Sequence, residues 1–273
     1  MSMLTKLRTK ITDHMSQHMY ESAVFWADKL VTMSGNDAED VYRLAQAYYL
    51  AGLHQRSMHA IRQAGLTHQH DKFRYLVAKC HVVREEWEQA LEALGEDLMV
   101  AEDRSDGETD FRPAMCLLRG KVYDAMDNRP KSIESYRRAL QLDCYCYEAF
   151  EHLTQHHLLS SSEQEALMQE VNFGAGDEWV ALMCRTKIDR YQTQSTVEMA
   201  MDKAAGQQAA ASTKVPAAAS PIVHLEALHS QYGLDGNLDL QASRAETQYY
   251  GHDYSGSISI CREILKKDPH NLT

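Results

Sequence analysis

Hydrophobic residues recur along most of this chain every three to four positions, a spacing typical of amphipathic helices. The first such segment covers about residues 3 to 16, where Leu4, Leu7 and Ile11 share an apolar face. A second covers about 20 to 33 and ends before Gly35 and Asn36, residue types that favour the end of a helix. The alternation of helix, turn and helix continues to about residue 191 and returns near residue 234. The pattern therefore predicts an all-α chain of antiparallel helix pairs.

These helix pairs repeat, and the repeat is clearest between residues 116 and 147. If Gly120 is position 8 of a unit of about 34 residues, Tyr123 falls at position 11, Ser132 at 20, Tyr136 at 24 and Ala139 at 27. Small residues at positions 8, 20 and 27 with aromatic residues at 11 and 24 are the signature of a tetratricopeptide repeat (TPR). Only position 32, usually proline, departs from it. This stretch therefore predicts a TPR helix pair.

The same register recurs at other places, with position 8 at Ile11, Ala45, Ala78, Gly120 and Ala245. The spacing of 42 between Ala78 and Gly120 indicates an insertion at 96–113, which is acidic and rich in turn-forming residues. The expected fold class is an all-α TPR superhelical solenoid. The residues expected to pack between its helices are Ile11, Ala23, Ala45, Tyr48, Ser57, Ala64, Ala78, Ala90, Gly120, Tyr123, Tyr136, Ala139, Ala245, Tyr254 and Pro269.

Two repeat-containing parts joined by a linker are expected. Residues 1–191 form an N-terminal array of about five repeats, and residues 222–273 form a further unit. Between them, residues 192–221 are rich in Ala, Ser and Gln and predict a disordered linker or a long inserted loop, because so few large apolar side chains cannot offset the entropy of ordering. The chain stops four residues after Pro269, so we expect a truncated array.

Composition narrows the classes of function. A net charge of −11 disfavours general attraction to nucleic acid or to an anionic membrane. No apolar run approaches the roughly 20 residues that span a bilayer, and the N-terminus lacks a signal peptide's apolar core. We therefore expect the nucleus and cytoplasm as the location. In that reducing setting the six scattered cysteines are expected to pack as small hydrophobic side chains.

Five runs of sequence resemble one family more closely than a generic TPR requires. They are 21–30 (ESAVFWADKL), 41–52 (VYRLAQAYYLAG), 74–81 (RYLVAKCH), 116–129 (CLLRGKVYDAMDNR) and 142–159 (LDCYCYEAFEHLTQHHLL). The family is the TPR scaffold subunit of the anaphase-promoting complex, or cyclosome, of the cell-division-cycle-sixteen (Cut-nine) type.

The resemblance implies a non-catalytic scaffold within a cullin–RING ubiquitin ligase that marks cell-cycle regulators for destruction in mitosis. It also implies partners: a second copy bound through the N-terminal repeats, and other TPR, cullin and RING subunits of the complex. A small accessory subunit would bind a groove of later repeats, which this sequence does not include.

A dimer contact is expected at Leu4, Leu7, Ile11, Phe25, Trp26 and Tyr49. The apolar face of the first helix is the stronger case, because a terminal helix leaves its outer side uncovered. Phe25 and Trp26 point about 100° apart on their helix, so either both pack in the core or one meets a partner chain. Tyr48 and Tyr49 leave the same two alternatives open.

Catalytic, metal and cofactor sites find no support. His152 and His156 have the i, i+4 spacing of a zinc pair but lack further ligands, so we interpret them and His157 as packing or surface residues. Cys116 lies among apolar residues, and no glycine-rich phosphate loop occurs. No cofactor is expected.

The alternative function is a TPR co-chaperone or adaptor that binds a peptide terminus. A clamp of this kind needs lysine and asparagine donors for a carboxylate. The corresponding positions hold Arg8, Thr12, Arg43, Lys72 and Leu76. Both asparagines and the last basic residue are missing, which disfavours this alternative.

Overall fold

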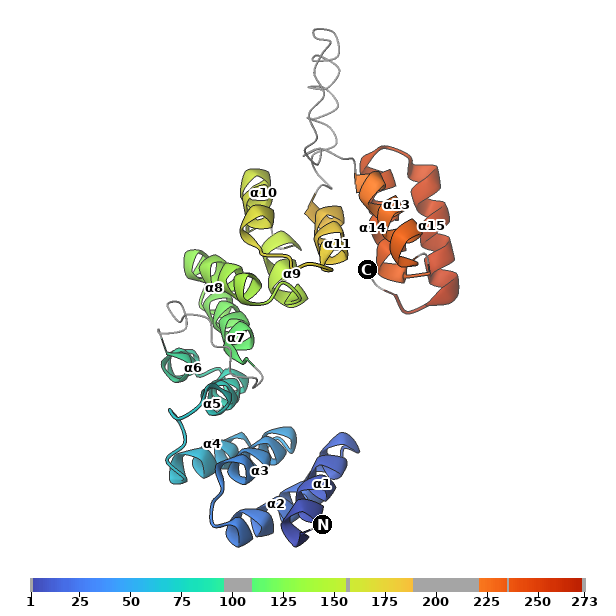
Figure 1. Cartoon of the computed structure of the whole chain (residues 1–273). Coiled ribbons are helices and arrows are strands. Elements are labelled where there is room, and N and C mark those ends of the chain that lie inside the picture. The colour runs from blue at the N-terminus through green and yellow to red at the C-terminus, as the bar shows by residue number, and fades with distance from the viewer. Residues whose placement is uncertain (1, 96–109, 156–157, 189–220, 235, 272–273) are drawn as a thin grey trace. The chain divides into compact units, whose positions relative to one another are not determined.

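The structure, a computed structural model, describes residues 2–95, 110–155, 158–188, 221–234 and 236–271. These residues form fourteen helices and no strand, which confirms the expected all-α fold (Figure 1). None of the helices in these ranges is long and apolar enough to cross a bilayer. The helices are α1 (Met3–Ser16), α2 (Tyr20–Ser34), α3 (Ala38–Leu50), α4 (His54–Gln63), α5 (Asp71–Val83), α6 (Trp87–Leu94), α7 (Arg112–Ala125), α8 (Arg129–Leu142), α9 (Tyr147–Gln155), α10 (Ser161–Glu170), α11 (Glu178–Ile188), α13 (Pro221–Tyr232), α14 (Leu238–Tyr250) and α15 (Tyr254–Lys267).

Short turns join the helices of each pair, and one turn position has the same backbone conformation in five pairs. The residue at repeat position 15 has a positive φ, which ends the first helix and lets the chain reverse. These residues are His18 (φ 60°), Gly52 (76°), Glu85 (59°), Asp127 (55°) and His252 (64°). The backbone therefore repeats with the register that the sequence predicts.

The described helices form two compact units, Met1–Asp143 and Cys144–Thr273. In the first unit, one core joins α1, α2 and α3 around Ile11, Leu30 and Leu44. A second core joins α3, α4 and α5 around Ile61 and Phe73. Because α3 contributes to both cores, neighbouring pairs stack through shared helices.

One close helix contact in this unit involves Gly120 of α7 and Tyr136 of α8. A Cβ atom added at Gly120 would lie 2.5 Å from Cδ1 of Tyr136, so only glycine allows the ring to fit. Tyr136 is fully buried, and its hydroxyl donates a hydrogen bond to Oδ2 of Asp124 at 2.5 Å. Burial and the neighbouring Asp124 carboxylate raise the pKa of Tyr136, so the side chain stays neutral. The contact between positions 8 and 24 of this pair therefore follows the TPR packing pattern.

Most residues expected to pack between helices are buried. They are Ile11, Ala23, Ala45, Tyr48, Ser57, Ala78, Ala90, Gly120, Tyr123, Tyr136, Ala139 and Ala245. Ala64 is half-buried against the second core. Two residues differ from the expectation. Tyr254 begins α15 and is 51% exposed, with its ring against Tyr249 instead of between helices, and Pro269 is exposed beyond the end of α15.

In the second unit, α11 and α13 pack against each other, although residues 189–220 separate them in the sequence. Leu225 and Leu228 of α13 share a core with Leu240 of α14, and Trp179 and Met183 of α11 pack against it. Along the sequence, the boundary between the two compact units follows Asp143, whereas the sequence predicts a boundary near residue 192. Most of the predicted insertion at 96–113 and of the predicted linker at 192–221 lies outside the described residues.

Candidate protein-binding site

A buried carboxylate ties the first helix pair to the second. Asp40 on α3 is fully buried and accepts two hydrogen bonds from Arg8 of α1, from Nε at 2.8 Å and from Nη2 at 2.7 Å. Arg43 adds a contact from Nη1 at 3.0 Å. Burial alone would oppose ionisation, but the hydrogen bonds from Arg8 and Ser34 and the two guanidinium charges lower the pKa of Asp40. The cluster is therefore an internal ion pair that fixes α1 against α3.

The residues at the positions of a carboxylate clamp already make contacts within this chain. Arg8 and Arg43 bind Asp40, and Lys72 bonds to Glu39. Leu76 is buried in the second core. The cations that would hold a peptide terminus thus already have partners within this chain, which further disfavours the co-chaperone alternative.

The expected dimer residues on α1 face this chain's own core. Ile11 is fully buried, so its inclusion in a contact between copies is wrong. Leu4 and Leu7 are half-buried against the same core as Ile11. Tyr49 is half-buried, and Nζ of Lys79 lies 4.9 Å from its ring centre. The apolar stripe of α1 is therefore the inner side of the first helix pair.

By contrast, α2 exposes large hydrophobic side chains. Phe25 is 54% exposed and Trp26 is 42% exposed, with their rings edge to face at 5.1 Å. Met33 is exposed seven residues after Trp26, about two helical turns away on the same side, and Met19, the N-cap residue just before α2, is exposed as well. We call these four residues the α2 outer face. Both aromatic residues thus lie on the surface, which differs from either alternative that the sequence left open.

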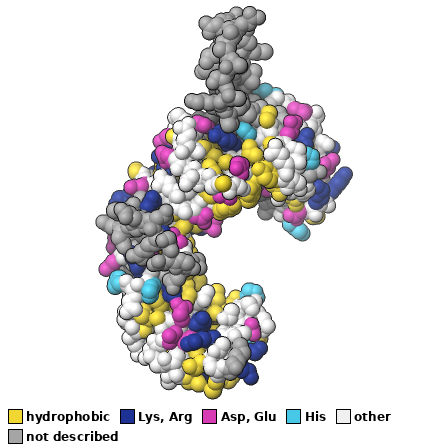
Figure 2. Space-filling view, in the orientation of Figure 1, with side chains coloured by type: hydrophobic (Ala, Val, Ile, Leu, Met, Phe, Trp, Pro, Cys, Tyr) yellow, Lys and Arg dark blue, Asp and Glu magenta, His cyan; other side chains and the backbone are white. Residues whose placement is uncertain are grey.

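Figure 2 shows hydrophobic side chains on the surface beside basic and acidic ones at the lower end of the view, where the N-terminal helices lie. Exposed aromatic and methionine side chains gathered on one helix are typical of protein contacts. The α2 outer face is therefore an exposed hydrophobic patch with the composition of a protein contact.

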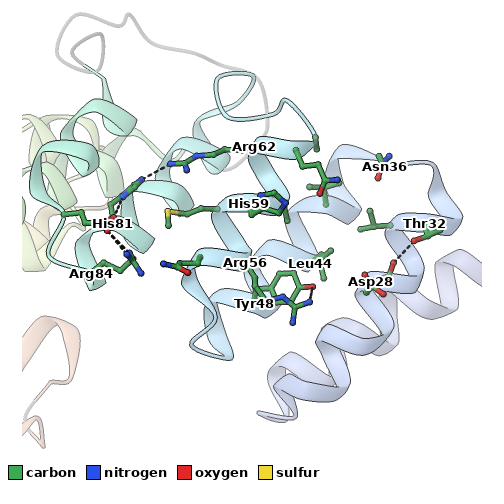
Figure 3. Close-up of a pocket in the computed structure, with 18 residues that line it drawn as sticks. Asp28, Thr32, Asn36, Leu44, Tyr48, Arg56, His59, Arg62, His81 and Arg84 are labelled. Carbon is green, nitrogen blue, oxygen red and sulfur yellow. Dashed lines mark hydrogen bonds and ion pairs between the residues drawn. The ribbon is translucent and has the colours of Figure 1, made fainter.

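A groove of about 1040 Å³ runs along α4 (Figure 3). The polar side chains that α4 turns toward it are Gln55, Arg56, His59, Arg62 and Gln63. Asp28 and Thr32 of α2 line one side, and His81, Arg84 and Glu86 line the other. We call this the α4 groove. Our sequence predictions do not include it.

A hydrogen-bonded chain fixes one end of the α4 groove. Nδ1 of His81 bonds to Glu86 at 2.6 Å, and Nε2 of His81 faces Nη2 of Arg62 at 3.3 Å. Arg84 donates from Nε to the other oxygen of Glu86 at 2.9 Å. The hydrogen bonds from Arg84 and then His81 lower the pKa of Glu86 to about 2. Glu86 is therefore ionised and neutralised at this end of the groove.

Among the described residues, no group of three or more His, Cys, Asp or Glu side chains is arranged to hold a metal ion. His156 and His157 of the histidine run lie outside the described residues. Cys80, Cys116 and Cys184 are buried, as expected, whereas Cys261 is exposed. Burial raises the pKa of Cys116 to about 11 and that of Cys184 to about 12, so neither is a thiolate nucleophile at neutral pH.

Comparisons with known proteins relate the chain to one kind of protein complex. A family model described as "Anaphase-promoting complex, cyclosome, subunit 3" matches residues 16–97. The human protein "Cell division cycle protein 16 homolog" is 30% identical over 292 residues, which cover 99% of this chain and 43% of that protein. "Anaphase-promoting complex subunit 6" of Arabidopsis thaliana is 31% identical and covers 98% of this chain and 50% of its own length. The chain thus spans about half the length of the curated relatives it matches.

The chain is also similar in structure to a subunit of a solved complex. The chain in "Crystal structure of APC/C hetero-tetramer Cut9-Hcn1" is similar with a TM-score of 0.81 and 26% identity, over 100% of this chain and 48% of that one. The expected TPR fold class is thereby confirmed. Because the family model is named for subunit 3, the type of subunit depends on the relatives that match almost the whole chain. These relatives confirm that this chain is similar, along nearly all of its length, to the Cdc16/Cut9-type TPR subunits of the anaphase-promoting complex.

Proposed function

We propose that this chain is a non-catalytic scaffold subunit of the anaphase-promoting complex, the cullin–RING ubiquitin ligase of the resembled family. Stacked helix pairs would hold other TPR, cullin and RING subunits at fixed distances and so support ubiquitin-dependent degradation of cell-cycle regulators in mitosis. The observation that carries the proposal is the match of almost the whole chain to the human Cdc16 homolog, together with its structural similarity to a chain of the Cut9–Hcn1 complex.

Affinity purification of the tagged chain from dividing cells, followed by mass spectrometry, tests this proposal. Cullin, RING and TPR subunits of the complex should co-purify. Recovery of heat-shock chaperones without these subunits would contradict the proposal and favour the co-chaperone alternative. The proposal also assigns the chain to the nucleus and cytoplasm, which imaging of the tagged chain in the same cells tests.

The proposal includes a homodimer formed through the N-terminal repeats, with the α2 outer face as the contact. Phe25 and Trp26 supply the aromatic area that dominates many protein interfaces. Burying them against a second copy would remove this hydrophobic surface from water. Leu7 and Ile11 are not suitable probes of this contact, because charge at these positions would disturb the chain's own core.

Light scattering of the purified chain tests the dimer. The variant Phe25→Asp/Trp26→Asp should be monomeric at concentrations where the wild type is dimeric, with unchanged helix content. Val83→Asp/Met126→Asp is the matched control, because both residues are exposed hydrophobic side chains outside α2. A dimer that survives the α2 variant, or that the control also disrupts, would refute this contact.

A further inference from the structure

The segment that carries the α4 groove has an unusual charge pattern. One residue in seven is acidic across the chain, 39 of 273. The thirty residues from Val41 to His70 contain no acidic residue, although they hold three arginines and four histidines. Two of these arginines, Arg56 and Arg62, lie on the groove side of α4. A chain with a net charge of −11 thus presents a cationic strip along one helix.

The two arginines of this strip are oriented but not neutralised. Nη2 of Arg56 donates to the Tyr48 hydroxyl at 2.8 Å, and its guanidinium lies 4.4 Å from the centre of that buried ring. Arg62 bonds to Nε2 of His81, whose other nitrogen bonds to Glu86. No carboxylate of the described residues pairs with Arg56 or Arg62, whereas Arg84 pairs with Glu86.

We propose that the α4 groove binds an acidic peptide segment of a partner protein, with Arg56 and Arg62 as the charged donors. A guanidinium presents two parallel N–H groups that match a carboxylate, and a bond to a charged acceptor is stronger than one to a neutral acceptor. The contacts with Tyr48 and His81 already restrict the two side chains, so binding loses less conformational entropy. This inference goes beyond the proposed scaffold role.

The spacing of the two donors limits the peptide. Residues six apart on a helix are separated by about 9 Å along its axis, since each residue rises about 1.5 Å. An extended peptide rises about 3.3 Å per residue, so carboxylates about three residues apart would meet both arginines. His59 lies between the two arginines along the groove, and Gln55 and Gln63 add amide groups that can bond to the peptide backbone. The preferred ligand is therefore an extended segment with Glu or Asp at every third position.

Fluorescence anisotropy with the full chain tests this inference. The probe is a labelled 12-residue synthetic peptide with Glu at every third position, and its control carries Gln at the same positions. The wild type should bind the Glu peptide, bind the Gln peptide at least about tenfold more weakly, and lose affinity as salt is raised. Arg56→Gln/Arg62→Gln should also lose at least about tenfold in affinity.

Lys6→Gln/Lys266→Gln is the matched control, because it removes two exposed positive charges outside the groove. Its affinity should stay within about twofold of the wild type. Arg56→Lys/Arg62→Lys keeps the charge without the planar donor pair and should bind with intermediate affinity. Circular dichroism of each variant checks that its helix content is unchanged.

The inference would be overturned if Arg56→Gln/Arg62→Gln and Lys6→Gln/Lys266→Gln lost the same affinity. It would be overturned as well if the Glu and Gln peptides bound equally, or if the Glu peptide did not bind at low salt. Stronger binding of a single-stranded RNA of the same net charge would also overturn it, because the groove would then recognise phosphate instead of carboxylate.

Discussion

The helix pairs α7–α8 and α14–α15 share one register, but only α7–α8 buries the side chain at position 24 of its second helix. Position 8 is Gly120 in the first pair and Ala245 in the second, and both residues are buried. Position 24 is Tyr136 in the first pair and Cys261 in the second. Tyr136 is fully buried beside Gly120, whereas Cys261 is exposed.

This difference shows that the register determines which positions face each other. The size of the side chains at these positions determines whether they pack closely. In α7–α8, glycine makes room for a ring whose hydroxyl reaches Asp124. In α14–α15, buried Ser257 and Ile264 hold the helices together, and Ile258 and Leu265 are exposed on α15. A repeat signature therefore predicts a helix pair more reliably than it predicts the outer side of that pair.

The largest contrast is expected at position 24. Tyr136→Ala removes a fully buried aromatic ring and should destabilise α7–α8 by about 3–5 kcal/mol, the range measured for large aromatic truncations. Cys261→Ala removes an exposed thiol and should change the stability of α14–α15 by less than about 0.5 kcal/mol. Native-state hydrogen exchange of the amides in each pair measures both effects. Similar losses in the two pairs would mean that the buried ring is not what distinguishes them.

A smaller effect is expected at position 8 of the tighter pair. Gly120→Ala places a methyl group against the Tyr136 ring, and overpacking should destabilise α7–α8 by about 1–3 kcal/mol. In an exposed helix the same change would stabilise by up to about 1 kcal/mol. The sign should therefore reverse when Gly120→Ala is made in the Tyr136→Ala background, where the ring is absent. If the double-mutant cycle shows no coupling, the close contact between the two residues is not the cause of the lost stability.

The sequence allowed the packing positions to be predicted because small and aromatic residues recur at fixed positions of one period. It did not predict which apolar faces are inner and outer. Ile11 and Trp26 both lie on amphipathic helices, yet Ile11 is fully buried and Trp26 is 42% exposed. Their difference depends on which neighbouring helix covers each face, and the period does not contain that information.

The α4 groove was missed for a different reason. Single arginines on a helix usually indicate a solvated surface, and the contacts of Arg56 with Tyr48 and of Arg62 with His81 join residues 8 and 19 positions apart. The absence of acidic residues from Val41 to His70 was the only available signal, and it becomes informative once α4 is known to line a groove.

The smallest expected effect distinguishes the caps of the two second helices. Oδ1 of Asp253 accepts hydrogen bonds from the backbone N–H of Gly256 and from the Ser255 hydroxyl, both at 3.0 Å, and these bonds lower the pKa of Asp253. A carboxyl group whose pKa is lowered on folding stabilises the folded chain above its unfolded pKa of about 3.9, and this contribution disappears as pH falls through the folded pKa.

Asn128 caps α8 through the backbone N–H of Lys131 and does not titrate in this range. Lowering the pH from about 5 to about 3 should therefore reduce the protection of the Gly256 amide, corrected for its intrinsic exchange rate, more than that of the Lys131 amide. Asp253→Asn should abolish the difference, because its amide oxygen can accept the same bond at either pH. If Gly256 kept its pH dependence in this variant, the titrating group would be elsewhere and the two caps would be equivalent. A loss confined to the start of α15 in the wild type would show that acid loosens one helix pair at its cap while the other keeps both its cap and its buried ring.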